Sequence, residues 1–191
     1  MRFRSAFVLP LILAAAACGS NDAAAPAGEA SAENTIPVDA GPSAAPSRAV
    51  ASLVDAQGKE VGTATLLPAG TGIRLAVQVN GLPAGEHGIH VHAVGKCEAP
   101  KFESAGSHWN PADKKHGLDN PAGAHAGDMP NLTVDADGRG IVNATIADMT
   151  VAQLLDSDGA AVVVHAKKDD QKTDPSGDSG DRIACGVLGS S

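Results

Sequence analysis

Histidines are crowded in one part of this 191-residue chain. Six of its seven histidines lie between His87 and His125. Histidine is an unusual choice for filling a core or solvating a surface, whereas its imidazole is the commonest protein ligand for metal ions. The crowding therefore indicates a metal site.

The first two candidate ligands share a short alternating segment, Gly88-Ile89-His90-Val91-His92. Such alternation predicts a strand, on which residues two apart face the same side, so both imidazoles can reach one ion. An isolated His-x-His pair is more often incidental. His165, at the end of another predicted strand, is a candidate third ligand, and ligation by nitrogen alone favours copper or zinc over magnesium or calcium.

A second set of candidate ligands follows in loop-like sequence. His108, His116 and His125 are spaced by eight and nine residues, and Asp128 stands three residues after the last of them. Each histidine alone would be read as a solvated loop residue, but three nitrogens and one carboxylate suit tetrahedral zinc. His87 is left out of both sets and is interpreted as a structural histidine that binds backbone near the start of its strand.

The elements that must position these residues are short strands. Turn signals such as Gln57-Gly58, Asn80-Gly81 and Asp137-Gly138 separate them. Many short strands with regular turns indicate an all-β antiparallel sandwich or barrel, and the chain length from residue 49 onward suits one domain. The absence of tyrosine predicts an aliphatic core, and Trp109 is expected to pack the loop beside His108. The predicted strands cover residues 49–53, 61–67, 73–79, 87–94, 132–134, 141–146, 161–164 and 183–188.

Five segments in order resemble the copper/zinc superoxide dismutases. They are His87-Gly-Ile-His-Val-His92, Ser107-His-Trp-Asn-Pro111, His116 to His125-Ala-Gly-Asp128, Val163-Val-His165 and Arg182-Ile-Ala-Cys-Gly-Val187. The similarity covers residues 49–191. It implies a Greek-key antiparallel β-barrel of the immunoglobulin-like sandwich type, with long metal-binding and active-site loops.

The resemblance also implies the site. Copper would be held by His90, His92, His108 and His165, and zinc by His108, His116, His125 and Asp128, so that His108 is shared as an imidazolate. Asp169 would accept hydrogen bonds from His90 and His116, although a solvated acid in a charged run is the plainer interpretation of the sequence. Arg182 would bind the substrate anion beside copper, and Cys97 and Cys185 would form a disulfide.

The implied activity is dismutation of superoxide to oxygen and hydrogen peroxide, with Arg182 and His108 as the catalytic residues and superoxide as the partner. The alternative is a non-catalytic periplasmic lipoprotein that binds copper and zinc through the same histidines. Arg182 and Asp169 favour the enzyme, because a protein that only buffers metals needs neither an arginine that binds the substrate anion nor a carboxylate that orients histidines of both metal sites. Members of the family differ in oligomeric state, so the resemblance allows a homodimer.

The N-terminus predicts export. A short basic start, Met1-Arg-Phe-Arg4, precedes an apolar run at residues 6–17 and then Cys18, which is the form of a signal peptide (1–17) ending at a lipidated cysteine. Ala15 stands where bacterial lipoprotein signals usually carry leucine, so simple cleavage remains the alternative. Residues 18–48, rich in Ala, Pro, Ser and Gly, are expected to be a flexible tether. The predicted location is the periplasm, with membrane contact through the lipid anchor only and an oxidising environment for the disulfide.

The net charge of −8 would become −10 once Arg2 and Arg4 are removed. This acidity argues against nucleic acid as a partner. It should also repel superoxide, so any attraction must be local. Lys167, Lys168 and Lys172 are candidates to focus a positive potential near Arg182, and a solvated loop face is the alternative interpretation.

Overall fold

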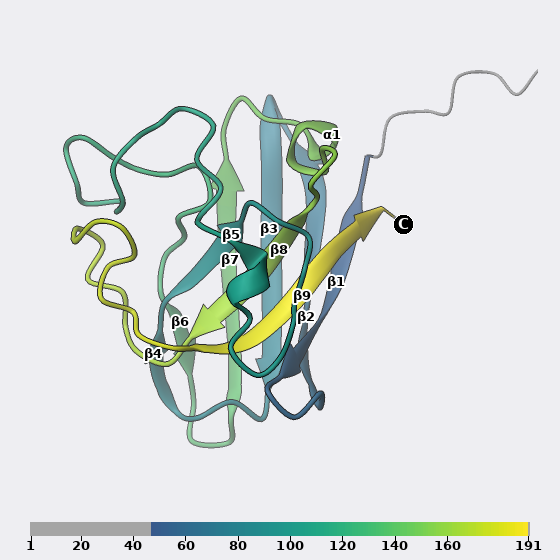
Figure 1. Cartoon of the computed structure of the whole chain (residues 1–191), viewed down its shortest axis with the longest axis vertical. Coiled ribbons are helices and arrows are strands. Elements are labelled where there is room, and N and C mark those ends of the chain that lie inside the picture. The colour runs from purple at the N-terminus through teal and green to yellow at the C-terminus, as the bar shows by residue number, and fades with distance from the viewer. Residues whose placement is uncertain (1–46, 191) are drawn as a thin grey trace, which may run out of the picture. The chain divides into compact units, whose positions relative to one another are not determined.

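The computed structural model describes residues 47–190. They form nine strands and two single-turn helical segments (Figure 1). The strands are β1 (Ala49–Asp55), β2 (Glu60–Ala69), β3 (Gly72–Asn80), β4 (Gly85–His87), β5 (Ile89–His92), β6 (Leu132–Val134), β7 (Arg139–Ile146), β8 (Ala160–His165) and β9 (Arg182–Ser190); the helical segments are η1 (Glu103–Ala105) and α1 (Val151–Leu154). The predicted signal peptide, Cys18 and the tether up to residue 46 lie outside the described residues.

All nine strands belong to one antiparallel sheet in the order β4-β6-β7-β3-β2-β1-β9-β8-β5. The strands at the two ends of this order, β4 and β5, are separated in the chain by Gly88 alone. Gly88 N donates to Lys167 O, and His165 N donates to Gly88 O, at 2.7 and 2.8 Å. The sheet therefore curls into a nearly closed barrel, which confirms the predicted all-β antiparallel architecture.

The predicted strand at residues 87–94 is in fact two strands. Residues 85–87 pair with β6, whereas residues 89–92 pair with β8. The change of partner at Gly88 carries the chain from one edge of the barrel to the other. Helix α1 was not predicted, although its capping box is legible in the sequence: Thr150 Oγ1 accepts from Gln153 N, and Gln153 Oε1 accepts from Thr150 N.

The barrel core is aliphatic, as predicted. Inward residues such as Leu53, Leu66 and Leu75 are fully buried, and Trp109 joins them at 7% exposure. A smaller cluster outside this core groups Phe102 and Val163 with Cys185. Within the described residues, no helix is long and apolar enough to span a membrane.

Candidate metal centre

Strand β5 is the platform of the site. His90 and His92 lie on it, and it pairs with β8 in a register that places His90 opposite Val163. That pairing brings His165, the last residue of β8, to the same end of the barrel. Two loops complete the site: the long loop, residues 93–131, and the second loop, residues 166–181, which joins β8 to β9.

Backbone hydrogen bonds fasten the long loop to the middle of β5. Val91 N donates to Gly127 O, Trp109 N donates to Val91 O, and Gly127 N donates to Trp109 O, all at 2.8 to 2.9 Å. Only glycine fits at position 127, because a Cβ there would overlap Val91 O. This arrangement sets His108 opposite His92 and Asp128 opposite His90.

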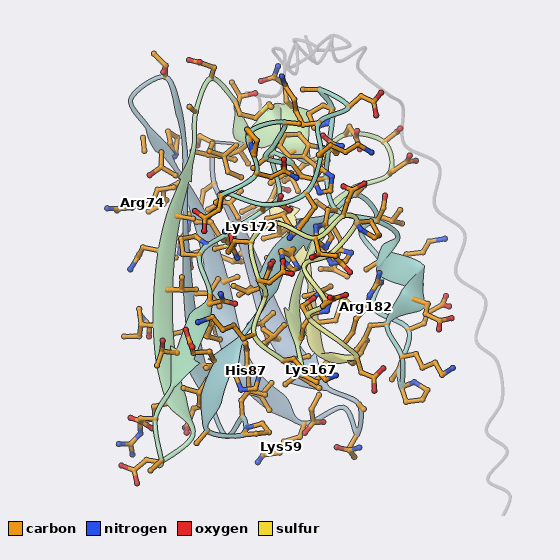
Figure 2. All side chains as sticks on the ribbon, turned by 90° about the vertical axis from the view of Figure 1, so that its left-hand side faces the viewer. Lys59, Arg74, His87, Lys167, Lys172 and Arg182 are labelled. Atoms are coloured by element: carbon orange, nitrogen blue, oxygen red, sulfur yellow. A yellow bond between two sulfur atoms is a disulfide. The ribbon has the colours of Figure 1, made fainter. Side chains whose placement is uncertain are left out.

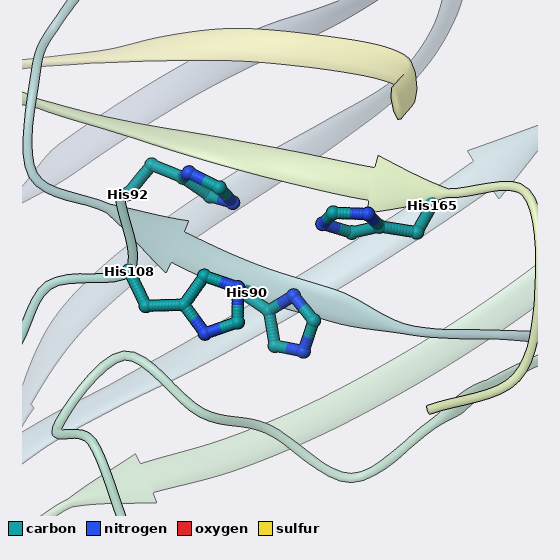
Figure 3. A group of neighbouring side chains, drawn as sticks. All are labelled: His90, His92, His108 and His165. Carbon is teal, nitrogen blue, oxygen red and sulfur yellow. The ribbon is translucent and has the colours of Figure 1, made fainter. Parts of the chain in front are cut away.

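Four histidine rings converge from β5, β8 and the long loop (Figure 3). One nitrogen from each ring lies within 4.8 Å of the others. These nitrogens are buried and have no hydrogen-bond partner among the described residues; they are His90 Nδ1, His92 Nε2, His108 Nε2 and His165 Nε2. Buried polar atoms are almost always paired, so four orphaned nitrogens aimed at one point fit a metal ion that takes nitrogen ligands. We call them the all-nitrogen group.

The second nitrogen of three of these rings is held by a fixed partner. His90 Nε2 donates to Asp169 Oδ2 at 2.6 Å. His92 Nδ1 donates to Gly106 O at 2.9 Å, and His165 Nδ1 donates to Gly180 O at 3.1 Å. A neutral imidazole carries one N–H, so these bonds leave a lone pair on each nitrogen of the all-nitrogen group.

A second group of donor atoms surrounds one carboxylate oxygen. Asp128 Oδ1 lies 2.9 Å from His108 Nδ1, 3.0 Å from His116 Nδ1 and 3.3 Å from His125 Nδ1. Ligands of a tetrahedral zinc ion lie about 3.3 Å from one another, so this spacing fits zinc. Asp128 Oδ2 is already occupied, because it accepts from Gly117 N and His125 N. We call Asp128 with these three histidines the carboxylate group.

His90 also lies near this group, and its ligand atom is within 4.8 Å of those of Asp128, His108 and His116. Its Nε2 is bound to Asp169, and its Nδ1 belongs to the four orphaned nitrogens. His125 Nδ1 lies 3.3 Å from both Asp128 Oδ1 and His108 Nδ1, which is the separation expected between two ligands of one tetrahedral ion. We therefore assign His125 to the carboxylate group and His90 to the all-nitrogen group.

The histidines of the metal centre differ in protonation. Burial lowers the pKa of His108 to about 4 and that of His165 to about 3, so both rings are neutral and able to ligate at pH 7. Burial alone would lower the pKa of His116 too, but hydrogen bonds to Asp128 and Asp169 raise it to about 9. A metal bound at His116 must therefore displace a proton.

Arg182 begins β9 beside the all-nitrogen group. Its guanidinium donates to Phe102 O and to Gly106 O, both at 2.7 Å. Gly106 O thus accepts hydrogen bonds from both Arg182 and His92. The Cys97–Cys185 disulfide is confirmed, and it ties this part of the long loop to the strand that carries Arg182.

The three candidate lysines do not form a single cluster. Lys168 Nζ pairs with Glu86 at 2.8 Å on the barrel edge. Lys167 packs along Gly180, the residue whose carbonyl holds His165, and Figure 2 shows it well apart from Lys172. Of the three lysines, Lys167 is therefore the one that lies beside Gly180, which holds His165.

His87 is placed as predicted. Its ring nitrogens lie 2.8 Å from His165 O and 2.9 Å from Pro83 O, so it binds backbone and stands outside both donor groups. Sequence reasoning missed the carbonyls of Gly106 and Gly180 and the side chain of Asn131, described below. Backbone acceptors carry no residue-type signal, and the role of Asn131 depends on the packing of two distant loops.

Comparisons with known proteins converge on one family. The family model described as copper/zinc superoxide dismutase matches residues 60–188. "Superoxide dismutase [Cu-Zn] 1" of Aquifex aeolicus is 41% identical over 144 residues, which cover 72% of this chain and 85% of the relative. "Superoxide dismutase-like protein YojM" of Bacillus subtilis is 42% identical over 143 residues, covering 71% of this chain and 73% of the relative.

Solved structures agree with this result. The crystal structure of a superoxide dismutase-like protein from Bacillus subtilis aligns with a TM-score of 0.69 at 41% identity, covering 73% of this chain and 97% of that one. The copper/zinc superoxide dismutase from Brucella abortus aligns with a TM-score of 0.61 at 28% identity, covering 74% and 99%.

Proposed function

Because the chain belongs to the copper/zinc superoxide dismutase family, whose members are oxidoreductases that bind copper and zinc, we propose that it dismutes superoxide to oxygen and hydrogen peroxide. The all-nitrogen group would hold copper and the carboxylate group would hold zinc. His108 has one nitrogen in each group and would be a ligand of both ions.

The observation that carries this proposal is that the two ring nitrogens of His108 face different donor groups. Its Nε2 is an orphaned nitrogen of the all-nitrogen group, whereas its Nδ1 lies 2.9 Å from Asp128 Oδ1. Between two divalent cations an imidazole can lose its second proton and bind both. A protein that simply bound two separate ions would have no reason to divide one ring between them.

Bound copper supplies a one-electron redox couple, through which one superoxide is oxidised to oxygen and another is reduced to peroxide, which takes up two protons. The side chains supply the rest. Hydrogen bonds to Asp169, Gly106 and Gly180 hold the ligand rings, so that no reorganisation is needed at each turnover. In the half-reaction in which His108 Nε2 is not a metal ligand, this nitrogen would hold one proton and deliver it to the departing peroxide, and water would deliver the other.

Arg182 binds the substrate anion. Its charge is permanent, and its hydrogen bonds to Phe102 O and Gly106 O fix the guanidinium beside the all-nitrogen group. In a protein of net charge −8, this local cation is what offers superoxide an attractive site.

A second candidate is a copper- and zinc-binding protein without turnover. It is favoured by one relative that is named dismutase-like rather than dismutase. The test is to load the purified protein with copper and zinc, measure both metals, and assay superoxide removal by pulse radiolysis. Stoichiometric copper and zinc with rapid dismutation supports the enzyme, whereas full loading without dismutation selects the metal-binding alternative.

We also propose that the protein is exported and held at a membrane surface by a lipid on Cys18, with its folded domain in the periplasm. The support is the sequence pattern at residues 1–18 and the disulfide, which needs an oxidising compartment. Mass spectrometry of the mature protein tests this proposal, because an unmodified N-terminus would exclude the lipid anchor.

A further inference from the structure

Two short segments are joined by side chains that bind each other's backbone. They are residues 129–131, at the end of the long loop, and residues 169–171, in the second loop. Asn131 Nδ2 donates to Asp169 O, and Asp169 N donates to Asn131 Oδ1, both at 2.8 Å. In return, Gln171 Nε2 donates to Met129 O at 3.2 Å. A single amide side chain thus satisfies both backbone polar groups of Asp169.

Asp169 is hydrogen-bonded to one histidine of each donor group. Its carboxylate is fully buried and lies 2.6 Å from His90 Nε2 and 3.0 Å from His116 Nε2. His90 belongs to the all-nitrogen group and His116 to the carboxylate group. A small rotation of Asp169 would therefore turn a ring in each group at once.

The surroundings of Asp169 leave little room for compensation. Gly177 lies directly against it, and a Cβ at position 177 would overlap Asp169 Oδ1. Asp169 also sits in a loop without helix or strand, so no sheet ladder fixes its backbone. The two bonds from Asn131, anchored at the start of β6, provide that connection to the barrel.

We propose that Asn131 is a positioning residue for the metal centre: by clamping the backbone of Asp169 it fixes the orientation of His90 and His116, and so sets metal affinity in both donor groups. The inference rests on the proposed metal centre. It differs from a general role in loop stability, because it requires that loss of the clamp should act on those two histidines.

The chemistry of the clamp needs an amide. Asp169 presents one donor and one acceptor side by side, and an asparagine side chain presents the complementary pair. Aspartate at position 131 would keep the acceptor but replace the donor with a second acceptor facing Asp169 O. Asn131→Asp should therefore disturb Asp169 as much as Asn131→Ala, despite its similar size.

The matched control is Gln171→Met. It removes the other side-chain bond between the same two segments and keeps Gln171 N, which binds the Asp169 carboxylate at 2.6 Å. If these contacts only hold the two loops together, the variants at positions 131 and 171 should have similar effects on zinc affinity and on the His90 resonance. If Asn131 positions Asp169, only its variants should alter the histidines.

The experiment measures zinc affinity by competition with a chromophoric chelator and follows the His90 Nε2–H resonance by proton NMR. For Asn131→Asp and Asn131→Ala we expect about a 10-fold loss of zinc affinity, with a shifted or exchange-broadened resonance, while Gln171→Met stays within about twofold of the parent. Equal affinities and an unchanged resonance in all variants, with only a lower melting temperature, would overturn the proposal.

These readouts separate this proposal from the proposed activity. If the parent protein binds both metals but does not dismute superoxide, the function fails and the role of Asn131 can still be judged from zinc affinity and NMR. Should Asn131→Ala not fold, Asn131→Asp and the control decide the matter.

Discussion

Removing the Cys97–Cys185 disulfide should affect both stability and activity. The bond closes a sequence separation of 88 residues. In the chain-entropy model, opening a loop of that length raises the entropy of the unfolded chain by about 15 cal/mol/K, which lowers the free energy of unfolding by about 4 to 5 kcal/mol at 25 °C. For a domain of this size that corresponds to a fall of roughly 12 to 18 °C in melting temperature.

The assay is urea unfolding of the Cys97→Ala/Cys185→Ala variant, with a chelator present so that metal binding does not mask the difference. Cys185 is fully buried beside Phe102, so the substitution also removes packing. Wild-type protein reduced by a thiol isolates the cross-link itself, since it keeps both sulfur atoms. A difference below about 1 kcal/mol between oxidised and reduced wild type would refute the entropy argument.

Activity should fall for a different reason. Phe102 and Gly106, whose carbonyls hold Arg182, lie in the part of the long loop that the disulfide fastens to β9. If release of the loop costs one of these bonds, about 1 kcal/mol, kcat/KM should drop about fivefold. The drop should appear at temperatures at which the reduced protein is still folded and metal-loaded; an unchanged kcat/KM would show that Arg182 is held without the disulfide.

Three further predictions concern the site. Arg182→Ala should lower kcat/KM by about 10- to 100-fold, because a charge-assisted contact with the anion is lost, and Arg182→Lys should lower it less. Equal kcat/KM of the parent protein and both variants in steady-state assays would show that Arg182 has no role in catalysis. His108→Ala should weaken copper and zinc binding together in chelator titrations, and an unchanged affinity for either ion would contradict the bridge. Protein stripped of metal by a chelator should be most stable near pH 6.5 to 7. Below pH 6.5 His108 and His165 are protonated in the unfolded chain but stay neutral in the folded protein down to about pH 4 and 3. The free energy of unfolding therefore falls by up to about 1.4 kcal/mol per pH unit for each histidine. In the other direction, the stability that His116 contributes below pH 6.5 is lost as pH rises through 9, and pH-dependent urea midpoints that rise steadily from pH 5 to 10 would refute this assignment.

The spacing of His90 and His92 was enough to predict that they share one face of a strand. Local alternation likewise placed most strands to within about two residues, and the absence of tyrosine was enough to predict an aliphatic core. The split of the strand at Gly88 was not predictable, since residues 85–92 are a continuous extended segment and only the pairing partner changes. A change of partner is a long-range event that leaves no local pattern.

The participation of His165 illustrates the same limit. From the residues alone it was a histidine at the end of an apolar strand, and its proximity to His90 follows from the register of β5 against β8. The resemblance to a known family supplied that register indirectly. Neither local pattern nor family resemblance predicted the role of Asn131, whose bonds to Asp169 join the long loop to the second loop across 38 residues of sequence.

The choice of which nitrogen faces each ion lies outside the histidines themselves. Gly106 O selects Nε2 of His92, Gly180 O selects Nε2 of His165, and Asp169 selects Nδ1 of His90 by occupying the other ring nitrogen. All three partners sit in loops, whereas these histidines sit on strands. A change in either loop can therefore alter metal binding while every ligand residue remains in place, so complete ligand sets in related sequences are not sufficient grounds for assuming equal activity.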